Sequence, residues 1–342
     1  MIEHYIRGFE EELREIRHQI HENPELGLQE FKTSALVAEK LRQWGYKVEQ
    51  GLATTGVVAT LKVGDGEKSI GLRADMDALP IYENSGKPWA SKHPGLMHAC
   101  GHDGHTTILL GAARYFAETR RFNGTLRLIF QPAEEMINGG EIMVKEGLFD
   151  RFPCDVIFGM HNMPGLPVGK FFFQPGALMA SMDQFHITVR GCGGHGAIPH
   201  KAIDPVLVAA HITTALQSIV SRNVDPLEAA VITVGSIVAG EAANVIPDSA
   251  EMKISVRSLS RDTRQLLLTR IPALAQAQAA SFGATAEVTH VNGTPVLVND
   301  EEMARFAWQV ACKTFGEDQA EFGIKPLMGS EDFSFMLEAQ PK

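Results

Sequence analysis

The chain has 342 residues, of which 44% are hydrophobic and 21% charged, a composition typical of a folded globular protein of about two domains. Its 31 Lys and Arg against 41 Asp and Glu leave a formal charge of −10, which opposes binding to nucleic acid or to an anionic membrane. There is no apolar run of the ~20 residues that span a bilayer, no signal-peptide stretch, and too few cysteines for a disulfide scaffold, so we expect a reduced, cytoplasmic protein.

The first half of the chain alternates helical and strand patterns. Apolar residues spaced three and four apart predict one helix within residues 2–20 and another at 35–44. Four β-type runs follow, at 56–63, 70–74, 125–130 and 155–160. A helical face at 105–120 separates the second run from the third, and the glycine-containing segment 64–69 predicts a hairpin turn. This alternation indicates an α/β domain whose mixed sheet is flanked by helices.

The middle third has a different pattern. Strands are predicted at 185–189, 230–236, 252–256 and 284–290. Asp204-Pro205 begins one helix, with Asp as cap and Pro at the first position, and a second helix is expected at 262–282. The order β-α-β-β-α-β is that of a ferredoxin-like α+β domain.

After this region, a helix is expected at 301–315 and a short strand at 325–328. The pattern therefore predicts two domains. We expect a metal-binding catalytic domain at 1–178 and 292–342, and an inserted lid or dimerisation domain at 179–291.

Acids and a histidine follow three of the predicted strands. They are Asp75 and Asp77 after 70–74, Glu134 and Glu135 after 125–130, and His161 after 155–160. The segment 98–105 adds Cys100, His102 and two further histidines just before a helix. Taken singly, such residues are turn caps, solvated pairs, hydrogen-bonded histidines or core cysteines. Gathered at the carboxyl ends of strands in one sheet, they would repel or lie desolvated unless a cation held them.

The residue types indicate the chemistry. Cys, His and Glu are ligands for Zn²⁺, and carboxylate with imidazole also suits Mn²⁺ or Co²⁺. Two adjacent glutamates can divide the work: one binds metal, and the other takes a proton from the metal-bound water, whose pKa falls from 15.7 toward ~7. The combination predicts hydrolysis of an amide.

Eight stretches resemble the M20 metallopeptidase superfamily, in the amidohydrolase branch that contains hippurate hydrolases and plant indole-acetyl-amino-acid hydrolases. They are RHQIHENPEL (17–26), GLRADMDALP (71–80), MHACGHDGHT (97–106), FQPAEE (130–135), GMH (159–161), GGHGAIPH (193–200), NVIP (244–247) and MGSEDF (328–333). These stretches extend over nearly the whole chain. MHACGHDGHT together with FQPAEE is highly specific.

The resemblance implies roles for residues of the first domain. The expected metal ligands around two divalent ions (Zn, Mn, Co or Ni) are Cys100, His102, Glu135 and His161. Glu134 matches the catalytic base. Asp75 and Asp77 match a metal-site motif of the wider superfamily, and we expect them to support the ligands rather than bind the ions.

The resemblance also implies roles for the inserted domain. His195 matches a histidine that polarises the scissile carbonyl, often from a neighbouring subunit, which predicts a homodimer or higher oligomer. Asn244 matches a residue that holds the substrate's carboxylate, and Arg257 is a second candidate for that role. A turn residue and a loop cap are the structural alternatives for His195 and Asn244.

The C-terminal region departs from the family pattern, which continues into a final strand and a late histidine ligand. No histidine follows His290 in this sequence. We therefore expect a catalytic domain truncated at its C-terminus, with reduced metal occupancy and weak or absent activity.

The leading hypothesis is a metal-dependent amidohydrolase acting on hippurate-like N-acyl or N-aroyl amino acids. Two alternatives stay open. In one, Cys100 is a nucleophile with a histidine partner, so an alkylator would abolish activity and a chelator would not. In the other, the chain is a catalytically incomplete, metal-dependent binder of acyl-amino acids.

Overall fold

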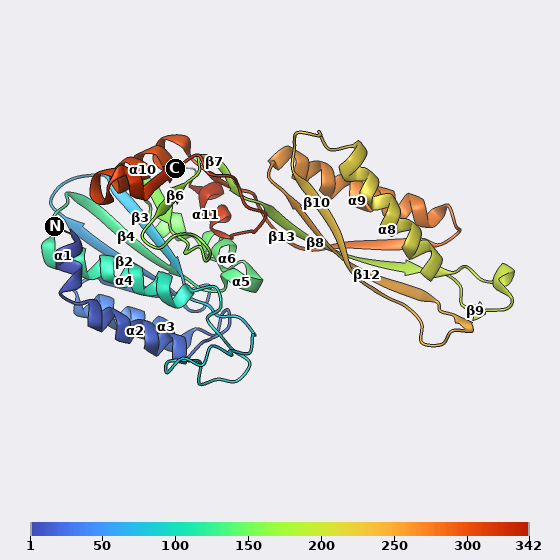
Figure 1. Cartoon of the computed structure of the whole chain (residues 1–342), viewed down its shortest axis with the longest axis horizontal. Coiled ribbons are helices and arrows are strands. Elements are labelled where there is room, and N and C mark those ends of the chain that lie inside the picture. Colours follow the sequence, from blue (N-terminus) through green and yellow to red (C-terminus); the bar gives the residue numbers. More distant parts are fainter. Residues whose placement is uncertain (1, 341–342) are drawn as a thin grey trace. The chain divides into compact units, whose positions relative to one another are not determined.

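The computed structural model describes residues 2–340, which form two compact units (Figure 1). Unit 1 contains the described residues up to Phe171, Glu302–Glu321 and the described residues from Asp332 onward. Unit 2 contains Phe172–Glu301 and Phe322–Glu331. Each unit has its own cluster of buried apolar side chains.

Unit 1 is built on a five-stranded mixed sheet, as the sequence predicts. Its strands are β1 (Lys47–Leu52), β2 (Gly56–Val63), β3 (Ser69–Asp75), β4 (Gly124–Gln131) and β5 (Val156–Gly159). The spatial order is β1-β2-β4-β3-β5, in which β3 runs parallel to β4 and β5 while β2 runs antiparallel to β4 and β1. Three strands therefore end at one edge of the sheet.

Two details of this sheet differ from the sequence-based expectations. The segment 64–69 is not a hairpin turn, because β4 lies between the two strands that it connects. The edge strand β1, with the sequence KVEQGL, has no apolar alternation and was not predicted.

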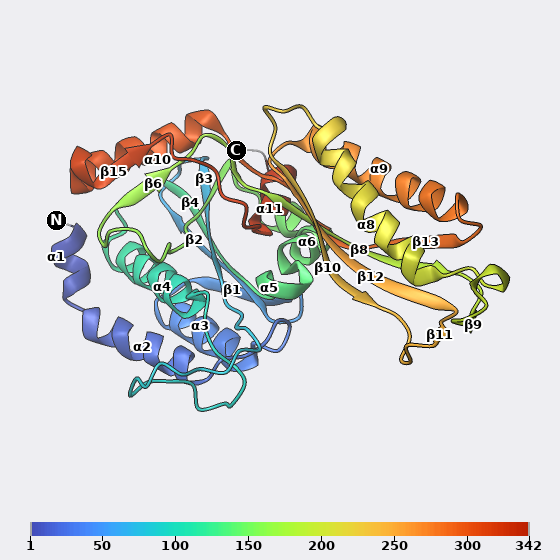
Figure 2. The same ribbon diagram turned by 45° about the vertical axis from the view of Figure 1, so that its right-hand side comes forward.

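Four helices begin unit 1: α1 (Ile2–Arg7), α2 (Glu10–Glu22), α3 (Phe31–Gln43) and α4 (His102–Thr119). The single helix expected within 2–20 is wrong, because the chain turns at Gly8 and Phe9. Helices α2, α3 and α4 cover one face of the sheet (Figures 1 and 2), where Leu41 and Leu110 pack with Leu128 of β4.

Further helices complete unit 1. They are α5 (Glu134–Ile137), α6 (Gly139–Lys145), α7 (Leu148–Arg151), α10 (Glu301–Phe315) and α11 (Phe333–Ala339). Because side chains alternate along a strand, Ala74 of β3 faces the α4 side while Arg73 faces the opposite side. The guanidinium carbon of Arg73 lies 5.6 Å from the centre of the Phe333 ring, so α11 packs on that opposite face.

Unit 2 has the β-α-β-β-α-β order that the sequence predicts. Its elements are β8 (Ser181–Arg190), α8 (Pro205–Arg222), β10 (Ala230–Val238), β12 (Ser249–Ser258), α9 (Arg261–Ala280) and β13 (Thr285–Thr294). The strands form an antiparallel sheet of order β10-β12-β8-β13, the ferredoxin-like arrangement.

The remaining short strands are β6 (Phe171–Phe173), β7 (Gly176–Met179), β9 (Gly194–His195), β11 (Val245–Ile246), β14 (Leu297–Asn299) and β15 (Ala320–Phe322), with 3₁₀ turns at Pro199–Lys201 and Glu317–Gln319. They form three two-stranded sheets, in which β11 pairs with β9, β14 with β7 and β15 with β6.

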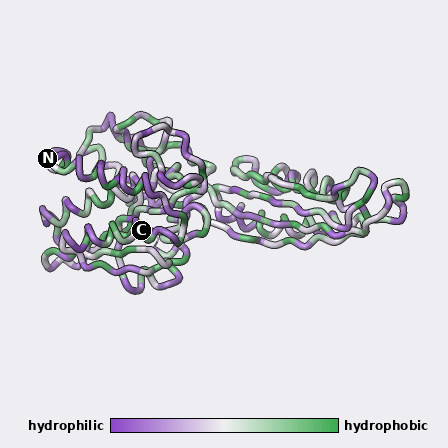
Figure 3. Tube along the Cα trace, turned by 90° about the horizontal axis from the view of Figure 1, so that it is seen from below, coloured by the Kyte–Doolittle hydropathy of each residue, from purple (hydrophilic) through white to green (hydrophobic). Residues whose placement is uncertain are grey.

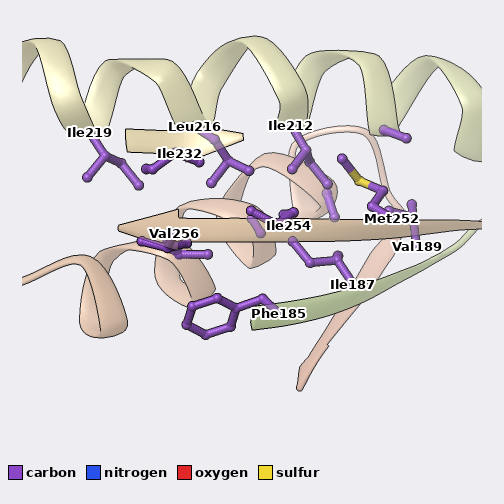
Figure 4. Close-up of a cluster of buried hydrophobic side chains, with 14 of the residues drawn as sticks. Phe185, Ile187, Val189, Ile212, Leu216, Ile219, Ile232, Met252, Ile254 and Val256 are labelled. Carbon is purple, nitrogen blue, oxygen red and sulfur yellow. The ribbon is translucent and has the colours of Figure 1, made fainter. Parts of the chain in front are cut away.

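One face of the unit 2 sheet is covered by α8. Figure 4 shows Ile212, Leu216 and Ile219 of α8 directed toward the strand that carries Ile254 and Val256. The helix starts where the sequence predicts, because the Asp204 carboxylate accepts hydrogen bonds from the Val206 and Leu207 backbone N–H groups at 2.9 and 3.4 Å.

Hydrophobic and hydrophilic residues are interspersed along both units (Figure 3). Among residues 2–340, none of the helices combines the length and apolarity needed to cross a bilayer.

Candidate metal centre

The strand ends of unit 1 bring the predicted ligands together. Cys100 and His102 lie at the start of α4, Glu134 and Glu135 at the start of α5, and His161 just after β5. Potential ligand atoms of Cys100, His102 and His161 all lie within 4.8 Å of one another, as do those of His102, Glu134 and Glu135. His102 is common to both groups and is the centre of the cluster.

Two buried atoms in the cluster lack a hydrogen-bond partner among the described residues: His102 Nε2 and Glu135 Oε1. They lie 3.8 Å apart, and Cys100 Sγ is 3.4 Å from His161 Nε2. Buried polar atoms are normally paired, so these two are placed to contact an ion or a water. Thiolate, imidazole and carboxylate donors suit Zn²⁺ and related divalent cations, so these side chains fit a metal.

Asp77 makes hydrogen-bond contacts that orient two of the predicted ligands, His102 and Glu135. Its Oδ1 lies 3.2 Å from His102 Nδ1, and its Oδ2 accepts a hydrogen bond from the Glu135 backbone N–H at 3.0 Å. A hydrogen on Nδ1 leaves the lone pair of His102 Nε2 directed into the cluster. Both carboxylate oxygens of Asp77 thus contact predicted ligands on atoms other than those directed into the cluster.

Asp75 connects the cluster to residues that the sequence analysis did not select. Its Oδ2 accepts from Arg73 Nη1 and its Oδ1 from His105 Nδ1, each at 2.7 Å. Asp75 Oδ2 is also 3.8 Å from His102 Nε2. One signal for His105 was available: it follows His102 by three residues on α4, a spacing that places both on one helical face.

The cluster shifts the ionisation of its members. Burial raises the pKa of the Cys100 thiol and of the Glu135 carboxyl. Burial alone would lower the pKa of His102, but the Asp75 charge and the Asp77 hydrogen bond outweigh it and hold that pKa well above its usual range. Burial would raise the pKa of Asp75, yet the charges of His102 and Arg73 hold it well below. A raised thiol pKa is the reverse of an activated cysteine nucleophile.

Glu134, the predicted base, and Ala133 before it are each held by a hydrogen bond to a residue remote in sequence. Its Oε1 accepts a hydrogen bond from the Asp332 backbone N–H at 3.4 Å. The preceding residue, Ala133, has the left-handed φ of 56°, and its N–H donates to Glu30 Oε1 at 2.8 Å. The sequence analysis assigned no role to Glu30 or Asp332, because their contacts depend on the fold.

Unit 2 brings His195 and Asn244 together. Strand β9 pairs with β11, placing His195 opposite Val245, and the Gly196 N–H donates to the Asn244 carbonyl at 2.8 Å. His195 Nδ1 accepts from the Ala197 N–H at 3.1 Å, so the ring proton lies on Nε2. His195 is exposed and offers that N–H as a donor.

Arg257 lies at the other end of unit 2. It is opposite Met182 in the sheet, whereas Ser249, at the end of β12 near β9, is opposite Arg190. Eight residues of strand separate the two positions, about 26 Å. Arg257 donates to the Met328 carbonyl at 2.9 Å, and the structure of unit 2 does not bring it to His195 and Asn244.

The chain is similar in sequence and in structure to several known proteins. A family model described as peptidase family M20/M25/M40 matches residues 71–342. Hippurate hydrolase of Campylobacter jejuni is 50% identical over 327 residues, which are 96% of this chain and 85% of that protein. N-acetyl-L-cysteine deacetylase of Bacillus subtilis is 40% identical over 333 residues, covering 97% and 79%. The crystal structure of the Bacillus subtilis YXEP protein, described as a dinuclear metal binding peptidase from the M20 family, has a TM-score of 0.83 at 35% identity, covering 97% and 87%.

Proposed function

Because the chain belongs to peptidase family M20/M25/M40, we propose that it is a metal-dependent amidohydrolase that cleaves hippurate-like N-acyl or N-aroyl amino acids. One observation carries the proposal: buried His102 Nε2 and Glu135 Oε1, which lack hydrogen-bond partners among residues 2–340, meet beside Cys100, His161 and Glu134. The relatives named hippurate hydrolase and N-acetyl-L-cysteine deacetylase support the substrate class.

The residues present divide the reaction among them. A bound divalent cation would lower the pKa of water and polarise the substrate carbonyl. Glu134 takes a proton from the attacking water and returns it to the leaving amine. The Asp332 backbone N–H, 3.4 Å from Glu134 Oε1, holds that carboxylate in place.

Unit 2 supplies the groups that recognise the substrate. His195, with its proton on Nε2, donates to the oxyanion that develops on the carbonyl oxygen. Asn244, which the β9–β11 pair brings beside His195, binds the substrate's carboxylate. Arg257 is the second candidate for that carboxylate. If His195 acts from a neighbouring subunit, the working form is a homodimer or a higher homo-oligomer.

We propose that Cys100, His102, Glu135 and His161 hold two divalent ions chosen from Zn, Mn, Co and Ni. The description of YXEP as dinuclear supports the number. All four cysteines are free thiols in the structure, as is usual in a reducing compartment, which supports a cytoplasmic location.

The test of the proposed function is Glu134→Gln. This variant keeps the shape of the side chain but cannot accept a proton, so turnover of hippurate-like substrates should fall by about 10²–10⁴-fold while the metal is retained. Glu141→Gln is the matched control, because Glu141 lies on the next helix, α6, and pairs with Lys145 on the surface. Loss of metal from Glu134→Gln, or unchanged turnover, would contradict the role of Glu134.

The 3.4 Å contact between Cys100 Sγ and His161 Nε2 also suits a cysteine nucleophile with a histidine base. The raised pKa of Cys100 opposes this alternative. The two mechanisms respond differently to reagents. A chelator stops the metal-dependent enzyme but leaves a cysteine enzyme active. An alkylator stops a cysteine enzyme without loss of metal. A chain that binds acyl-amino acids but forms no product over a long incubation would favour the non-catalytic binder.

A further inference from the structure

His105 is a buried side chain to which the mechanism above gives no role. It lies one turn beyond His102 on α4, and only 3% of its surface is exposed. Its Nδ1 is 2.7 Å from Asp75 Oδ1, and its Nε2 accepts a hydrogen bond from the Asn162 backbone N–H at 3.0 Å. Asn162 directly follows the ligand His161, so His105 connects α4 to the loop after β5.

The partners of His105 fix which ring nitrogen carries the proton. A backbone N–H can only donate, so Nε2 must be the acceptor and Nδ1 must hold the hydrogen that is donated to Asp75. The side-chain amide of Asn162 touches the same Nε2. Because amide nitrogen and oxygen exchange places by a half-turn, its NH₂ group can face the ring and donate as well.

The same peptide unit fixes the ring of His161. The His161 Nδ1–H donates to the Asn162 carbonyl at 2.6 Å, since a carbonyl oxygen can only accept. The lone pair of His161 Nε2, 3.4 Å from Cys100 Sγ, is thereby directed to the metal centre. We propose that His105 is a positioning residue that sets the tautomer and orientation of His161 through the Asn162 peptide.

Close packing around Asn162 supports this chain of contacts. A Cβ at Gly101, the residue between Cys100 and His102, would lie only 3.1 Å from Asn162 Cγ. Gly101 also has a φ of 93°, which favours glycine. The Asn162 side chain therefore rests directly on the backbone between two ligands, and the peptide that it carries has little freedom to move.

The proposal rests on the proposed metal centre, but a spectroscopic measurement on the metal-free protein tests it without activity. Long-range ¹H–¹⁵N correlation spectra report the protonated nitrogen of each imidazole ring. We expect both His105 and His161 to carry their proton on Nδ1. The resonances are assigned with His105→Gln and His161→Gln variants. A proton on Nε2 of His105, or two protons on its ring, would overturn the proposal.

Three substitutions separate the two contacts of His105. The amide oxygen in His105→Gln can reach the place of Nε2 and accept from the Asn162 N–H, whereas the amide in His105→Asn reaches only the place of Nδ1 and keeps Asp75 satisfied. His105→Phe keeps the ring but neither hydrogen bond. Metal affinity, measured by competition with a chromogenic chelator, should fall about 10–100-fold in the Asn and Phe variants and be largely restored in Gln.

Tyr46→Phe is the control for general destabilisation. It removes another buried hydrogen bond to α4, that of the Tyr46 hydroxyl to the Ala113 carbonyl at 2.8 Å, and should leave metal affinity unchanged. Wild-type affinity in His105→Asn, or a loss in His105→Gln as large as that in His105→Asn, would overturn the proposal. Failure of the wild-type chain to bind metal would instead contradict the proposed function, so the two failures are distinguishable.

Discussion

At the scale of single residues, Glu30 shows how a side chain remote in sequence supports the catalytic turn. Its Oε1 accepts from the Ala133 N–H at 2.8 Å and its Oε2 from the Thr55 hydroxyl at 2.5 Å. Ala133 needs this support because its φ of 56° is costly for a residue with a Cβ. Burial raises the pKa of Glu30 to about 7, so the carboxyl holds a proton where an exposed one would not.

This pKa predicts a dependence of stability on pH. The unfolded chain releases the Glu30 proton near pH 4.5 and the folded protein near pH 7, so the free energy of unfolding falls as pH rises through this window and then levels off. The fall amounts to about 3 kcal/mol. The Glu30→Gln variant should not show this fall in the free energy of unfolding. Urea unfolding of the metal-free protein at pH 5 and pH 8 would measure the difference.

The exposed Glu146 provides a control for that experiment. Glu146 also accepts a backbone hydrogen bond, from Ala53 at 2.7 Å, so Glu146→Gln removes a comparable contact at the surface. If wild type and Glu30→Gln lose stability in parallel as pH rises, Glu30 is not the group responsible.

The side chains proposed as ligands could be selected from the sequence because each follows a strand or begins a helix within a distinctive motif. Cys100, His102 and Glu135 are visible in MHACGHDGHT and FQPAEE. Glu30 and Asp332 could not be found in this way. Their roles depend on hydrogen bonds to Ala133 and Glu134, which lie 103 and 198 residues away in sequence.

At the scale of elements, α11 is fixed to the sheet by a buried ion pair. Asp332, the cap residue of α11, lies 3.1 Å from Arg73 Nη2 of β3 and accepts from the Gly140 N–H of α6 at 2.8 Å. Gln131 Nε2 at the end of β4 donates to both Asp332 oxygens, at 2.7 and 2.8 Å. One carboxylate thus joins two strands and two helices, and its own N–H holds Glu134.

Asp332→Ala should therefore be strongly destabilising. The substitution removes one of the carboxylates that pair with the buried Arg73 guanidinium. The free energy of unfolding should fall by about 3–5 kcal/mol, as expected when a buried ion pair is broken. Unfolding in urea followed by circular dichroism measures the loss. Glu3→Gln, which removes the exposed pair with Arg7, should leave the free energy of unfolding nearly unchanged. Similar losses in both variants would contradict the importance of the Asp332 network.

Sequence patterns predicted elements whose apolar residues form a continuous or periodic run and missed elements that lack such a run. Strand β2 was predicted to the residue, because seven of its eight positions are buried or half-buried apolar or small side chains. Strand β1 lies at the sheet edge and is mostly polar, so it has no apolar alternation to detect. Helices α5 to α7 are too short to show helical periodicity. The break at Gly8 was missed because the apolar spacing continues across it.

At the scale of the whole molecule, the two units have separate buried clusters of apolar side chains. The element orders predicted both sheets, but not that β4 separates β2 from β3, because neighbours in a sheet are chosen by long-range packing. The proposed metal centre belongs to unit 1, so metal binding should stabilise that unit. A cation at 1,000 times its dissociation constant stabilises by about 4.1 kcal/mol.

Calorimetry with and without chelator tests this expectation. Removal of metal should lower the transition of unit 1 and leave that of unit 2 in place. Ile212→Ala, in the core of unit 2, should lower the other transition, with a cost of about 2–5 kcal/mol. Equal shifts of both transitions on chelation would contradict independent stabilisation of unit 1.

The position of Asp332 along the chain has a consequence for the order of events during synthesis. The ligands Cys100 to His161 leave the ribosome together, whereas the residue whose N–H holds Glu134 follows 171 residues later, after all of the β-α-β-β-α-β unit. At about 5–20 residues per second, this interval is on the order of 10–30 s. On the proposed mechanism, a nascent chain would bind its cation well before Asp332 fixes Glu134, so metal binding and the onset of turnover would be separate steps of its maturation.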